Sequence, residues 1–433
     1  MADSLNIALI GGGTVGGGVA KILLDHPGRT ATRAGRPVLV KRVVVRDPAK
    51  PRPTIPKELI STDIQAAIHD PQVHVVVELI GGTGIAKQVV LDALAAGKHV
   101  VTANKALLAQ HGPEVFEVAR KHERAVGFEA SVAGGIPIIR ALAESLAGNQ
   151  ITAIQGILNG TSNFILTAMA DRGVGYADAL AEAQQLGYAE ADPTLDVDGS
   201  DAAHKLAILA QIAFGVTVPV DKIERFGIAG LHAMDLRFAQ ELGYTIKLLA
   251  EAWLDGREVA LHVAPVLLRR TDMLAQVRGA FNAVQVVGDA VGEVMFQGAG
   301  AGALPTASSV VADIIDLAVG RAQRTFQAMK LWAPHERGFR MRTSEGVRSR
   351  FFLRVLVKDE PGMLADVARA LADERISIAS VIQHEAQEDH QGGAVPLVIM
   401  THYAETGQFR KALARVNALP GVVLPGVYYS VDD

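Results

Sequence analysis

The sequence predicts an α/β protein in three parts: a doubly wound domain on a parallel sheet, an α+β domain, and a small β-α-β-β-α-β module. Over residues 1–140, short and uniformly apolar runs alternate with helical patterns, which is typical of parallel strands covered on both faces. From residue 151 onward, helices come first and strand-like runs follow, and residues 351–433 carry four strand-like runs and two helices. These observations predict three domains.

The first domain is expected to span residues 1–150. It begins with a buried strand at 6–10, a glycine-rich loop and a helix, and residues 25–37 are interpreted as an inserted loop. Further strands are expected at 38–45, 73–79 and 99–102, with helices at 86–96 and 113–122. This alternation indicates a Rossmann-like, doubly wound sheet.

The second domain, residues 151–320, is interpreted as a catalytic and dimerisation domain. Its expected elements are a strand at 151–158, helices at 161–171, 176–185, 201–214 and 238–253, strands at 259–267, 283–287 and 293–296, and a helix at 305–319. We expect that last helix to return to the first domain. Residues 321–350 carry eight Lys or Arg against two Asp or Glu, with Pro334, Gly338 and Gly346 interrupting any long element. Such a basic stretch is usually a solvated linker.

The last module, residues 351–433, is expected to have strands at 351–357, 378–384, 394–401 and 422–429 and helices at 363–373 and 407–417. This order is that of the ferredoxin-like fold. A glycine turn, Asp359-Glu-Pro-Gly362, comes directly before its first helix.

The composition indicates a globular protein that handles small molecules. A net charge of −4 over 433 residues gives no general attraction to nucleic acid or to an anionic membrane, so neither partner is expected. The absence of cysteine excludes disulfides, thiolate nucleophiles and cysteine-ligated metals. No run approaches the ~20 apolar residues that span a bilayer, and the first residues do not form a secretory signal. A cytoplasmic location is therefore expected.

The glycine loop predicts a dinucleotide site. Gly11 suits the tight turn after the first strand, Gly13 suits close approach to a pyrophosphate, and Gly16 suits close packing of the helix. Thr14 and Val15 complete the loop, and the free N–H groups of the helix that follows attract phosphate.

The end of the second strand bears on the choice of coenzyme. An acid there binds the ribose 2′-hydroxyl of NAD, whereas an arginine suits the 2′-phosphate of NADP. The strand ends in Arg46-Asp47, so both residue types are present. Arg46, with Lys50 or Lys57 as helpers, favours NADP, and NAD remains the alternative.

Four further segments resemble motifs of the homoserine dehydrogenases. They are TANKAL at 102–107, FEASVAGGIP at 128–137, LNGTSN at 158–163, and GYAEADP at 187–193 continued by Asp196 and by DAAHK at 201–205. With the glycine loop, they cover residues 7 to 320 in the order of that family. The last module is similar to an ACT domain, which many bacterial members carry.

The resemblance implies reversible NAD(P)H-dependent reduction of L-aspartate 4-semialdehyde to L-homoserine, a step of threonine and methionine biosynthesis. It implies Lys205 as the general acid and Lys105 as a second cation near the nicotinamide. It implies Glu190 as the partner of the substrate ammonium. The remaining residues that it implies are Gly187, Tyr188 and Asp196 at the substrate, Gly302 at the coenzyme, and Glu129 with the carbonyls of Val132, Gly134 and Ile136 around a sodium ion.

The lysine roles also make chemical sense from the residues alone. Hydride delivery to an aldehyde leaves negative charge on oxygen, so a proton donor or cation is needed within hydrogen-bond reach. Asp201 and Lys205 are four residues apart in a helical pattern and should share one face. Asp201 could instead serve only the helix N-terminus, and Lys105 could merely begin a helix.

The attached module suggests an amino-acid effector, with threonine feedback as a hypothesis and a role limited to oligomer contacts as its alternative. A homodimer or homotetramer is expected. The rival interpretations are another small-substrate dehydrogenase, a sensor that has lost catalysis, and a nucleic-acid binder that uses the basic linker. The retained Lys105 and Lys205 argue against the sensor, and the acidic net charge argues against the nucleic-acid binder.

Overall fold

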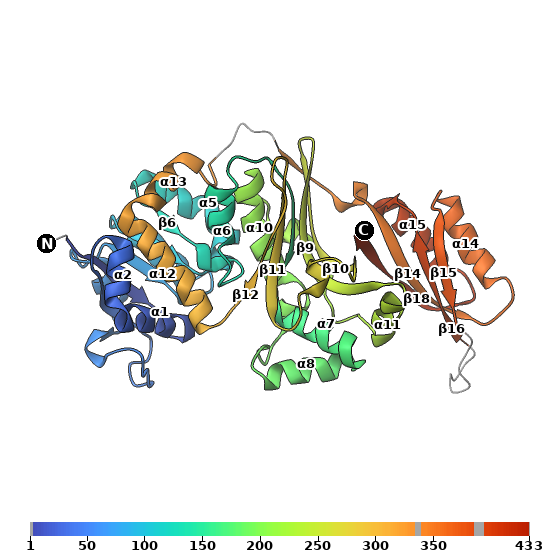
Figure 1. Cartoon of the computed structure of the whole chain (residues 1–433), viewed down its shortest axis with the longest axis horizontal. Helices are drawn as coiled ribbons and strands as arrows, with labels where there is room; N and C mark the ends of the chain where they lie inside the picture. The colour runs from blue at the N-terminus through green and yellow to red at the C-terminus, as the bar shows by residue number, and fades with distance from the viewer. Residues whose placement is uncertain (1–2, 334–338, 385–393, 433) are drawn as a thin grey trace.

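The computed structural model describes residues 3–333, 339–384 and 394–432. Figure 1 shows an elongated molecule in which the N-terminal domain, a middle domain and the C-terminal module follow one another along the long axis. This architecture confirms the predicted fold class, including the Rossmann-like first domain and the ferredoxin-like last one.

The N-terminal domain is built on a six-stranded parallel sheet. Its order is β3-β2-β1-β4-β5-β6, so successive strands are added on one side of β1 up to β3 and on the other side from β4 onward. Doubly wound folds bind their ligands at this switch point between β1 and β4. The strands are β1 (Leu5–Ile10), β2 (Val38–Val44), β3 (Ile60–Ser61), β4 (Val75–Glu78), β5 (His99–Thr102) and β6 (Val126–Gly127). Every residue of β1 is buried, as expected for a central strand covered on both faces.

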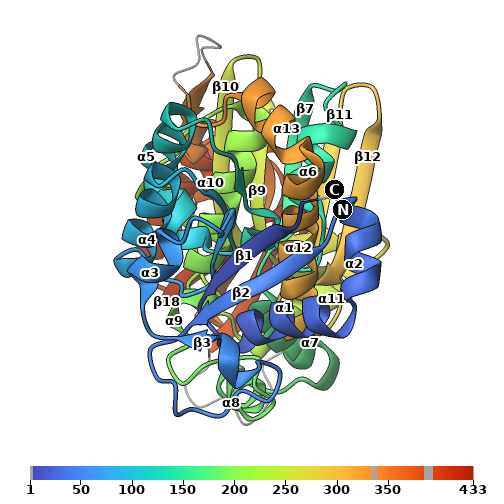
Figure 2. The same cartoon turned by 90° about the vertical axis from the view of Figure 1, so that its left-hand side faces the viewer.

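Helices cover both faces of this sheet. They are α1 (Thr14–Asp25), α2 (Pro27–Ala34), α3 (Ile64–Ile68), α4 (Ile85–Ala95) and α5 (Lys105–Lys121). Figure 2 shows α3, α4 and α5 on one side and α1 and α2 on the other, together with α12 (Ala303–Val319) from much later in the chain. The contact between α1 and α12 is close, because a Cβ on Gly18 would lie 2.6 Å from the carbonyl oxygen of Ala303. Glycine at this position lets the two helices meet.

The middle domain packs helices against one face of a sheet that is antiparallel except for β8, which pairs parallel with β10. Its strands are β7 (Ile151–Ile157), β8 (Glu224–Arg225), β9 (Tyr244–Asp255), β10 (Glu258–Arg269), β11 (Phe281–Gly288) and β12 (Gly292–Ala299). Its helices are α6 (Ile138–Arg140), α7 (Gly160–Arg172), α8 (Tyr176–Gln185), α9 (Thr194–Val197), α10 (Ser200–Phe214) and α11 (Ala233–Glu241). Helix α10 is almost wholly buried because it lies between this sheet and α5. It therefore joins the middle domain to the N-terminal one.

The C-terminal module joins the middle domain through its sheet. Its elements are β14 (Arg348–Lys358), α14 (Met363–Asp373), β15 (Ile378–Gln383), β16 (Ala394–Thr401), β17 (Ala404–Glu405), α15 (Thr406–Asn417) and β18 (Val422–Asp432). The order β18-β14-β16-β15 places β18 at the edge, where it pairs parallel to β10 with Ser430 opposite Val266. The two domains thus share one continuous sheet.

The structure corrects the expected helix at 238–253. The chain forms α11 up to Glu241, turns at Gly243 with φ of +87°, and continues as β9. β9 lies between β7 and β10 and is buried on both faces, so its sequence does not alternate. A continuous apolar run of this kind cannot be distinguished from a helix by periodicity alone.

Two expected loops also contain regular structure. Part of the interpreted insertion at 25–37 is α2, which has a proline in its first turn. The expected linker at 321–350 contains α13 (Arg321–Met329) and β13 (Arg340–Arg342), and the ring of Phe326 stacks on Phe116 of α5 at 5.4 Å. Arg321 and Arg324 are exposed on α13, whereas Phe326 of the same helix is partly buried. Pro334 and Gly338 of that segment lie outside the described residues.

Helix α5 begins at Lys105, earlier than the expected start at 113, and contains Pro113 in its interior. The strands β3 and β6, each two residues long, were not predicted. Within the described residues, no single helix is long and apolar enough to cross a membrane. The helices α12 and α13, which meet at 90°, have the required length and composition only when they are taken together.

Candidate active site

The glycine loop opens the N-terminal domain at the carboxyl end of β1. Gly11 has φ of +115°, and a Cβ there would lie 2.6 Å from the carbonyl oxygen of Leu79. A Cβ on Gly16 would lie 2.0 Å from the carbonyl oxygen of Gly11, so that helix and loop touch without side chains. Gly13 is exposed with open space where a Cβ would be, and Thr14 and Val15 begin α1 beside it. The loop therefore presents bare backbone and a helix N-terminus to an anion.

An arginine that the sequence analysis missed lies over this loop. Arg52 Nε donates to the carbonyl oxygen of Gly12 at 3.0 Å, and Nη1 donates to the carbonyls of Asp47 and Lys50 at 2.8 Å each. Arg46 at the end of β2 is exposed. Lys50 and Lys57 are exposed along the same segment. Arg52 lies eight residues after Val44, the last residue of β2, and nothing in the local sequence distinguishes it from its basic neighbours.

Two lysines from different domains meet at one buried aspartate. Asp201, in the first turn of α10, pairs through Oδ1 with Lys105 Nζ and through Oδ2 with Lys205 Nζ, each at 2.7 Å. Lys105 begins α5, whose N-cap Asn104 accepts the N–H of Leu107. Lys205 stands one turn after Asp201 on the same face of α10. The structure thus brings together all three residues predicted to be catalytic.

The surroundings give the two ammonium groups different properties. Lys205 is buried, which lowers its pKa, and the attraction of Asp201 only partly offsets this. The side chain of Lys105 is 42% exposed; burial would lower its pKa, but Asp201 outweighs that effect and raises it. Burial would raise the pKa of Asp201 as well, but Lys205 and Lys105 together hold it below its usual range. Asp201 is therefore an ionised anchor between two cations.

The segment after β7 positions this cluster. Lys205 Nζ donates to the carbonyl oxygen of Leu158 at 2.6 Å. Asn159 Nδ2 donates to Asp201 Oδ2 at 2.9 Å and to Asp196 Oδ1 at 2.8 Å, while its Oδ1 caps α7. Burial raises the pKa of Asp196. Neither Leu158 nor Asn159 was predicted to have a role, although both lie in the LNGTSN segment.

The predicted substrate residues lie on the loop after α8. Gly187 has φ of +75° and ends that helix in a left-handed turn. The carbonyl of Tyr188 accepts the hydroxyl of Thr161 at 2.7 Å, which ties the loop to α7. Glu190 is exposed, and its negative charge helps to raise the pKa of Lys105. The loop therefore lies at the edge of the lysine cluster.

Glu129 occupies a separate buried site. Its carboxylate accepts the backbone N–H groups of Ile139 and Arg140 at 2.9 Å each, at the start of α6. Burial raises the pKa of Glu129 to about 7. Asp313 of α12, another residue without an earlier assignment, accepts the N–H of Glu129 at 2.9 Å.

The other predicted cation ligands are close to Glu129 in sequence. Val132 and Ile136 are buried. The carbonyl of Gly134 accepts Ser309 Oγ at 2.7 Å, and that of Ile136 accepts the N–H of Ile138 at 2.8 Å. Because a carbonyl has two lone pairs, both retain acceptor capacity. No group of three or more His, Cys, Asp or Glu that could hold a metal occurs among the described residues. The predicted ligands are all oxygen atoms, and carboxylate and carbonyl oxygens suit hard cations.

Gly302, the last predicted coenzyme residue, is exposed at the N-terminus of α12, which lies beside α1. A glycine loop on a parallel sheet, together with a lysine-aspartate-lysine cluster at the border of a second domain, defines a nicotinamide-dependent oxidoreductase for a small substrate.

Comparisons with known proteins identify the family. The model of the homoserine dehydrogenase domain matches residues 137–315, that of the homoserine dehydrogenase NAD-binding domain matches 11–129, and that of the ACT domain matches 351–419. The chain is 45% identical to a homoserine dehydrogenase of Neisseria gonorrhoeae over 97% of both chains. It is 45% identical to one of Pseudomonas aeruginosa over 99% of both. The chain therefore belongs to the homoserine dehydrogenase family, as its motifs predicted.

Solved structures agree. A homoserine dehydrogenase from Thiobacillus denitrificans has a TM-score of 0.90 at 42% identity, covering 99% of this chain and 98% of that one. A hyperthermophilic archaeal homoserine dehydrogenase in complex with NADPH has a TM-score of 0.62 at 28% identity, covering 72% of this chain and 97% of that one. The predicted oxidoreductase class and the ACT module are confirmed, and the coenzyme is a nicotinamide dinucleotide.

Proposed function

We propose that this chain catalyses the reversible reduction of L-aspartate 4-semialdehyde to L-homoserine with NADPH. The observation that carries the proposal is the pairing of Lys105 and Lys205 on buried Asp201, where the nucleotide-binding domain meets the middle domain. When bound, the nicotinamide supplies the hydride, and the protein supplies position and charge.

Lys205 transfers the proton. Its contacts with Leu158 and Asp201 use two of the three protons of its ammonium group, which leaves one for the carbonyl oxygen of the substrate. During reduction Lys205 gives this proton to the developing alkoxide, and during oxidation neutral Lys205 removes it from the hydroxyl. Burial favours neutral lysine, so both forms are accessible closer to neutral pH than for an exposed lysine.

Lys105 stabilises the same oxygen as a fixed cation. Its pairing with Asp201 keeps it protonated, and its position at the start of α5 brings it to the border of the nucleotide-binding domain. Asp201 thus orients both lysines. Asn159 holds Asp201 in turn, which makes it a positioning residue.

Glu190 binds the substrate ammonium, with Gly187, Tyr188 and Asp196 shaping the same edge. Glu190 is exposed beside the cluster and carries a carboxylate that can pair with an amine. A matched pair of substrates tests this role, because 4-hydroxybutyrate is L-homoserine without its amino group. Glu190→Gln should raise the KM for L-homoserine by about 10- to 100-fold and leave turnover of 4-hydroxybutyrate as it is. Equal effects on both substrates would contradict the assignment.

The preferred coenzyme is NADP. Gly11, Gly13 and Gly16, with Thr14, Val15 and Gly302, form the pyrophosphate side, and Arg46 meets the 2′-phosphate. Arg52, held on the loop by Gly12, supports this basic site. The preference is tested by comparing kcat/KM for L-homoserine oxidation with NADP and with NAD. In Arg46→Ala the ratio of the two values should fall toward one. Equal kcat/KM values for both coenzymes in the wild type would contradict the preference for NADP.

The remaining proposals concern assembly and regulation. The domains span residues 1–150, 151–320 and 351–433. A sodium ion binds near Glu129, with the backbone carbonyls of Val132, Gly134 and Ile136 as further ligands. The chain forms a homodimer or homotetramer and is located in the cytoplasm. An amino-acid effector, threonine, acts through the ACT module. The sodium site is supported by the predicted ligands near Glu129, which are all oxygen atoms. Regulation through the ACT module is supported by the sheet that this module shares with the middle domain.

A further inference from the structure

A buried carboxylate joins the carboxyl ends of β4 and β5. Glu78 is the last residue of β4, is 0% exposed, and lies opposite Ile10 of β1 and Thr102 of β5 in the sheet. Its Oε1 accepts the N–H groups of Ile80 at 2.7 Å and Gly81 at 3.0 Å, and its Oε2 accepts the hydroxyl of Thr102 at 2.6 Å. A buried carboxyl group is costly unless it is hydrogen-bonded, and here donors from two strand ends meet it. Glu78 therefore fixes the segment after β4 to the end of β5.

Asn104 extends this contact to the helix that carries Lys105. The hydroxyl oxygen of Thr102 accepts the N–H of Asn104 at 3.0 Å, which leaves the O–H of Thr102 for Glu78. Asn104 Nδ2 donates to the carbonyl of Gly82 at 2.7 Å, while its Oδ1 caps α5. Lys105 is the first residue of that helix. These three residues, Glu78, Thr102 and Asn104, are called the Glu78 chain below, and they tie the loop after β4 to the start of α5.

The loop after β4, residues 79–84, depends on these contacts for its shape. Gly81 and Gly82 have φ of +81° and +74°, are exposed, and have open space where a Cβ would be. Glycine loses more conformational freedom on folding than any other residue, and it has no side chain that could pack. The loop is therefore held from below by Glu78 and from the side by Asn104.

This loop borders the half of the coenzyme site that receives the nicotinamide. A dinucleotide lies across the switch point of a doubly wound sheet, with one mononucleotide over each half. The end of β2 belongs to the adenosine half, because residues there meet the adenosine ribose, and β4 and β5 form the other half. Leu79 donates its N–H to the carbonyl of Ile10 at 2.8 Å, which keeps the loop beside the glycine loop. The Glu78 chain thus begins beneath the nicotinamide half and ends next to Lys105.

We propose that the Glu78 chain positions the loop at 79–84 and Lys105 as one unit, so that the nicotinamide and the cation beside the reacting oxygen keep a fixed relation. Its members act through the loop and through Lys105, which makes them positioning residues. Lys105 is held at its ammonium by Asp201 at 2.7 Å and at its backbone by the cap of α5. A misplacement of about 1 Å can lower a rate about 10²-fold, so such a tie matters for catalysis. The kinetic tests of this inference rest on the proposed function, whereas a coenzyme-binding test does not.

Thr102→Val tests the chain at its centre, because it removes the hydroxyl and keeps the shape of the side chain. It should lower kcat for L-homoserine oxidation about tenfold, through displacement of Lys105. It should also raise the KM for NADP by about 3- to 10-fold and leave the KM for L-homoserine within about twofold. Thr102→Ser keeps the hydroxyl and should restore most of kcat. A loss of kcat that is equal in Thr102→Val and Thr102→Ser would contradict the role of the hydroxyl.

A double-mutant cycle shows whether the chain acts through Lys105. If it does, Thr102→Val should lower kcat by less than about twofold when Lys105→Met is already present, because coupled residues are not additive. A full tenfold loss in both backgrounds would show that the two sites are independent and would overturn this part of the proposal.

Binding of coenzyme fragments tests the loop without any turnover. Calorimetric titration should show that Thr102→Val weakens NADPH binding by about 3- to 10-fold and leaves binding of 2′,5′-ADP, which carries only the adenosine half, as it is. Asn104→Ser is a second variant that keeps a cap acceptor for α5 and loses only the donor to Gly82. It should also weaken NADPH and spare 2′,5′-ADP. Equal weakening of both ligands would indicate a general disturbance of the domain and overturn the proposal.

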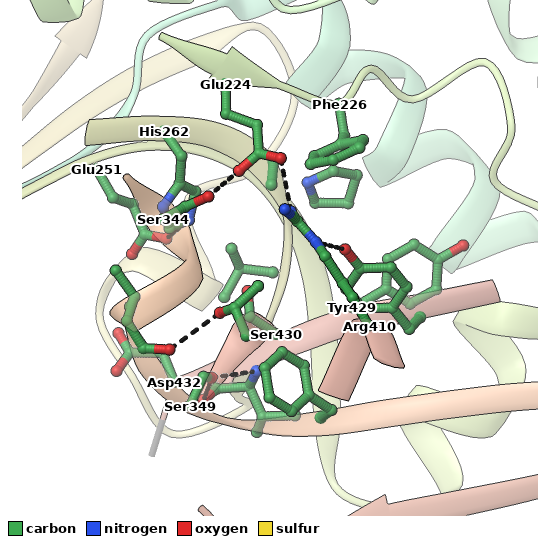
Figure 3. A pocket seen from close by; sticks show the side chains of 18 of the residues that line it. Glu224, Phe226, Glu251, His262, Ser344, Ser349, Arg410, Tyr429, Ser430 and Asp432 are labelled. Atoms are coloured by element: carbon green, nitrogen blue, oxygen red, sulfur yellow. Dashed lines mark hydrogen bonds and ion pairs between the residues drawn. The ribbon is translucent and has the colours of Figure 1, made fainter. Parts of the chain in front are cut away.

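Two control variants match the chemistry of Thr102→Val elsewhere in the molecule. Figure 3 shows the hydroxyl of Ser344 directed at the carboxylate of Glu224, in a pocket whose lining residues include none of the lysine cluster. Ser344→Ala removes a hydrogen bond of the same type. Thr401→Val is the same substitution at another fully buried threonine, whose hydroxyl accepts the N–H of Phe351 at 3.0 Å. Both controls should keep kcat and NADPH binding within about twofold of the wild type.

Unchanged kcat and unchanged NADPH binding in both Thr102→Val and Asn104→Ser would overturn the proposal as a whole. A wild-type chain that binds NADPH and does not oxidise L-homoserine would instead contradict the proposed function. In that case the comparison of NADPH with 2′,5′-ADP still decides whether the Glu78 chain positions the nicotinamide loop.

Discussion

Two buried aspartates in this chain meet different cations. Asp201 lies between Lys105 and Lys205, whereas Asp235 of α11 pairs with Arg354 of β14. Asp235 is 0% exposed, and Tyr429 Oη at 3.1 Å and the N–H of His232 at 3.0 Å complete its contacts. The first cluster has two cations on one anion, and the second has one cation and a full set of hydrogen bonds.

The two clusters differ in function: the Asp201 cluster can transfer a proton, whereas the Asp235 cluster joins two domains. Burial changes the pKa of a lysine, and the ammonium of Lys205 has one N–H that is not used by Leu158 or Asp201. A cluster with two lysines on one aspartate can therefore transfer a proton. An arginine stays charged and binds a carboxylate with two nitrogens, so the Asp235 cluster can only hold α11 against the C-terminal module. Changes in the first cluster should affect turnover, and changes in the second should affect stability.

The largest effect is expected for Lys205→Met. Losing the proton donor should lower kcat by about 10²- to 10⁴-fold, measured as L-homoserine oxidation. Lys247→Met is the matched control, because Lys247 is also buried, donates to Asn163 at 3.0 Å, and has a pKa lowered by burial to about 8. Since Lys247 lies outside the Asp201 cluster, its variant should lose stability and keep kcat within about threefold. A large loss of kcat in both variants would contradict the comparison.

The next effect is on stability. Asp235→Asn should lower the free energy of unfolding by about 3–5 kcal/mol, because Arg354 would remain buried without its anion. Urea unfolding of the full chain measures this, and kcat should change little in the remaining folded protein. Unaltered stability would show that the joint between the two domains does not depend on this pair.

Lys105→Met should have a smaller effect on turnover than Lys205→Met. The side chain of Lys105 is 42% exposed, so solvent screens its charge, and kcat should fall by about 10- to 100-fold. An effect as large as that of Lys205→Met would mean that Lys105 itself donates the proton.

The smallest effect is expected for Arg354→Lys. The ammonium keeps the charge but loses the paired nitrogens on Asp235, which should cost about 1–2 kcal/mol of stability. If this variant is as unstable as Asp235→Asn, the geometry of the guanidinium matters more than its charge.

The sequence was most informative where a local pattern has one physical meaning. The glycines at 11, 13 and 16 follow a buried strand, and the one-turn spacing of Asp201 and Lys205 predicts their shared face. The pairing of Asp201 with Lys105 could not be predicted, because it joins two domains through the packing of α5 on α10. Arg52 was missed for the same reason, since only the fold brings it onto Gly12.

Burial explains the errors in secondary structure. β9 is covered on both faces, so its apolar residues do not alternate and were interpreted as a helix. The basic charges of residues 321–350 suggested a linker, although that segment contains α13, whose Phe326 stacks on Phe116. In both segments the missing information is what the rest of the chain places against them.

The pH dependence of L-homoserine oxidation shows whether Lys205 moves the proton. Oxidation needs neutral Lys205, so kcat/KM should rise with pH through the pKa of Lys205, which burial places below the usual 10.5. Repulsion from Lys105 lowers that pKa further. In Lys105→Met the rising limb should therefore move to higher pH, and it should disappear in Lys205→Met. A limb that stays at the same pH in Lys105→Met and persists in Lys205→Met would contradict the role of Lys205.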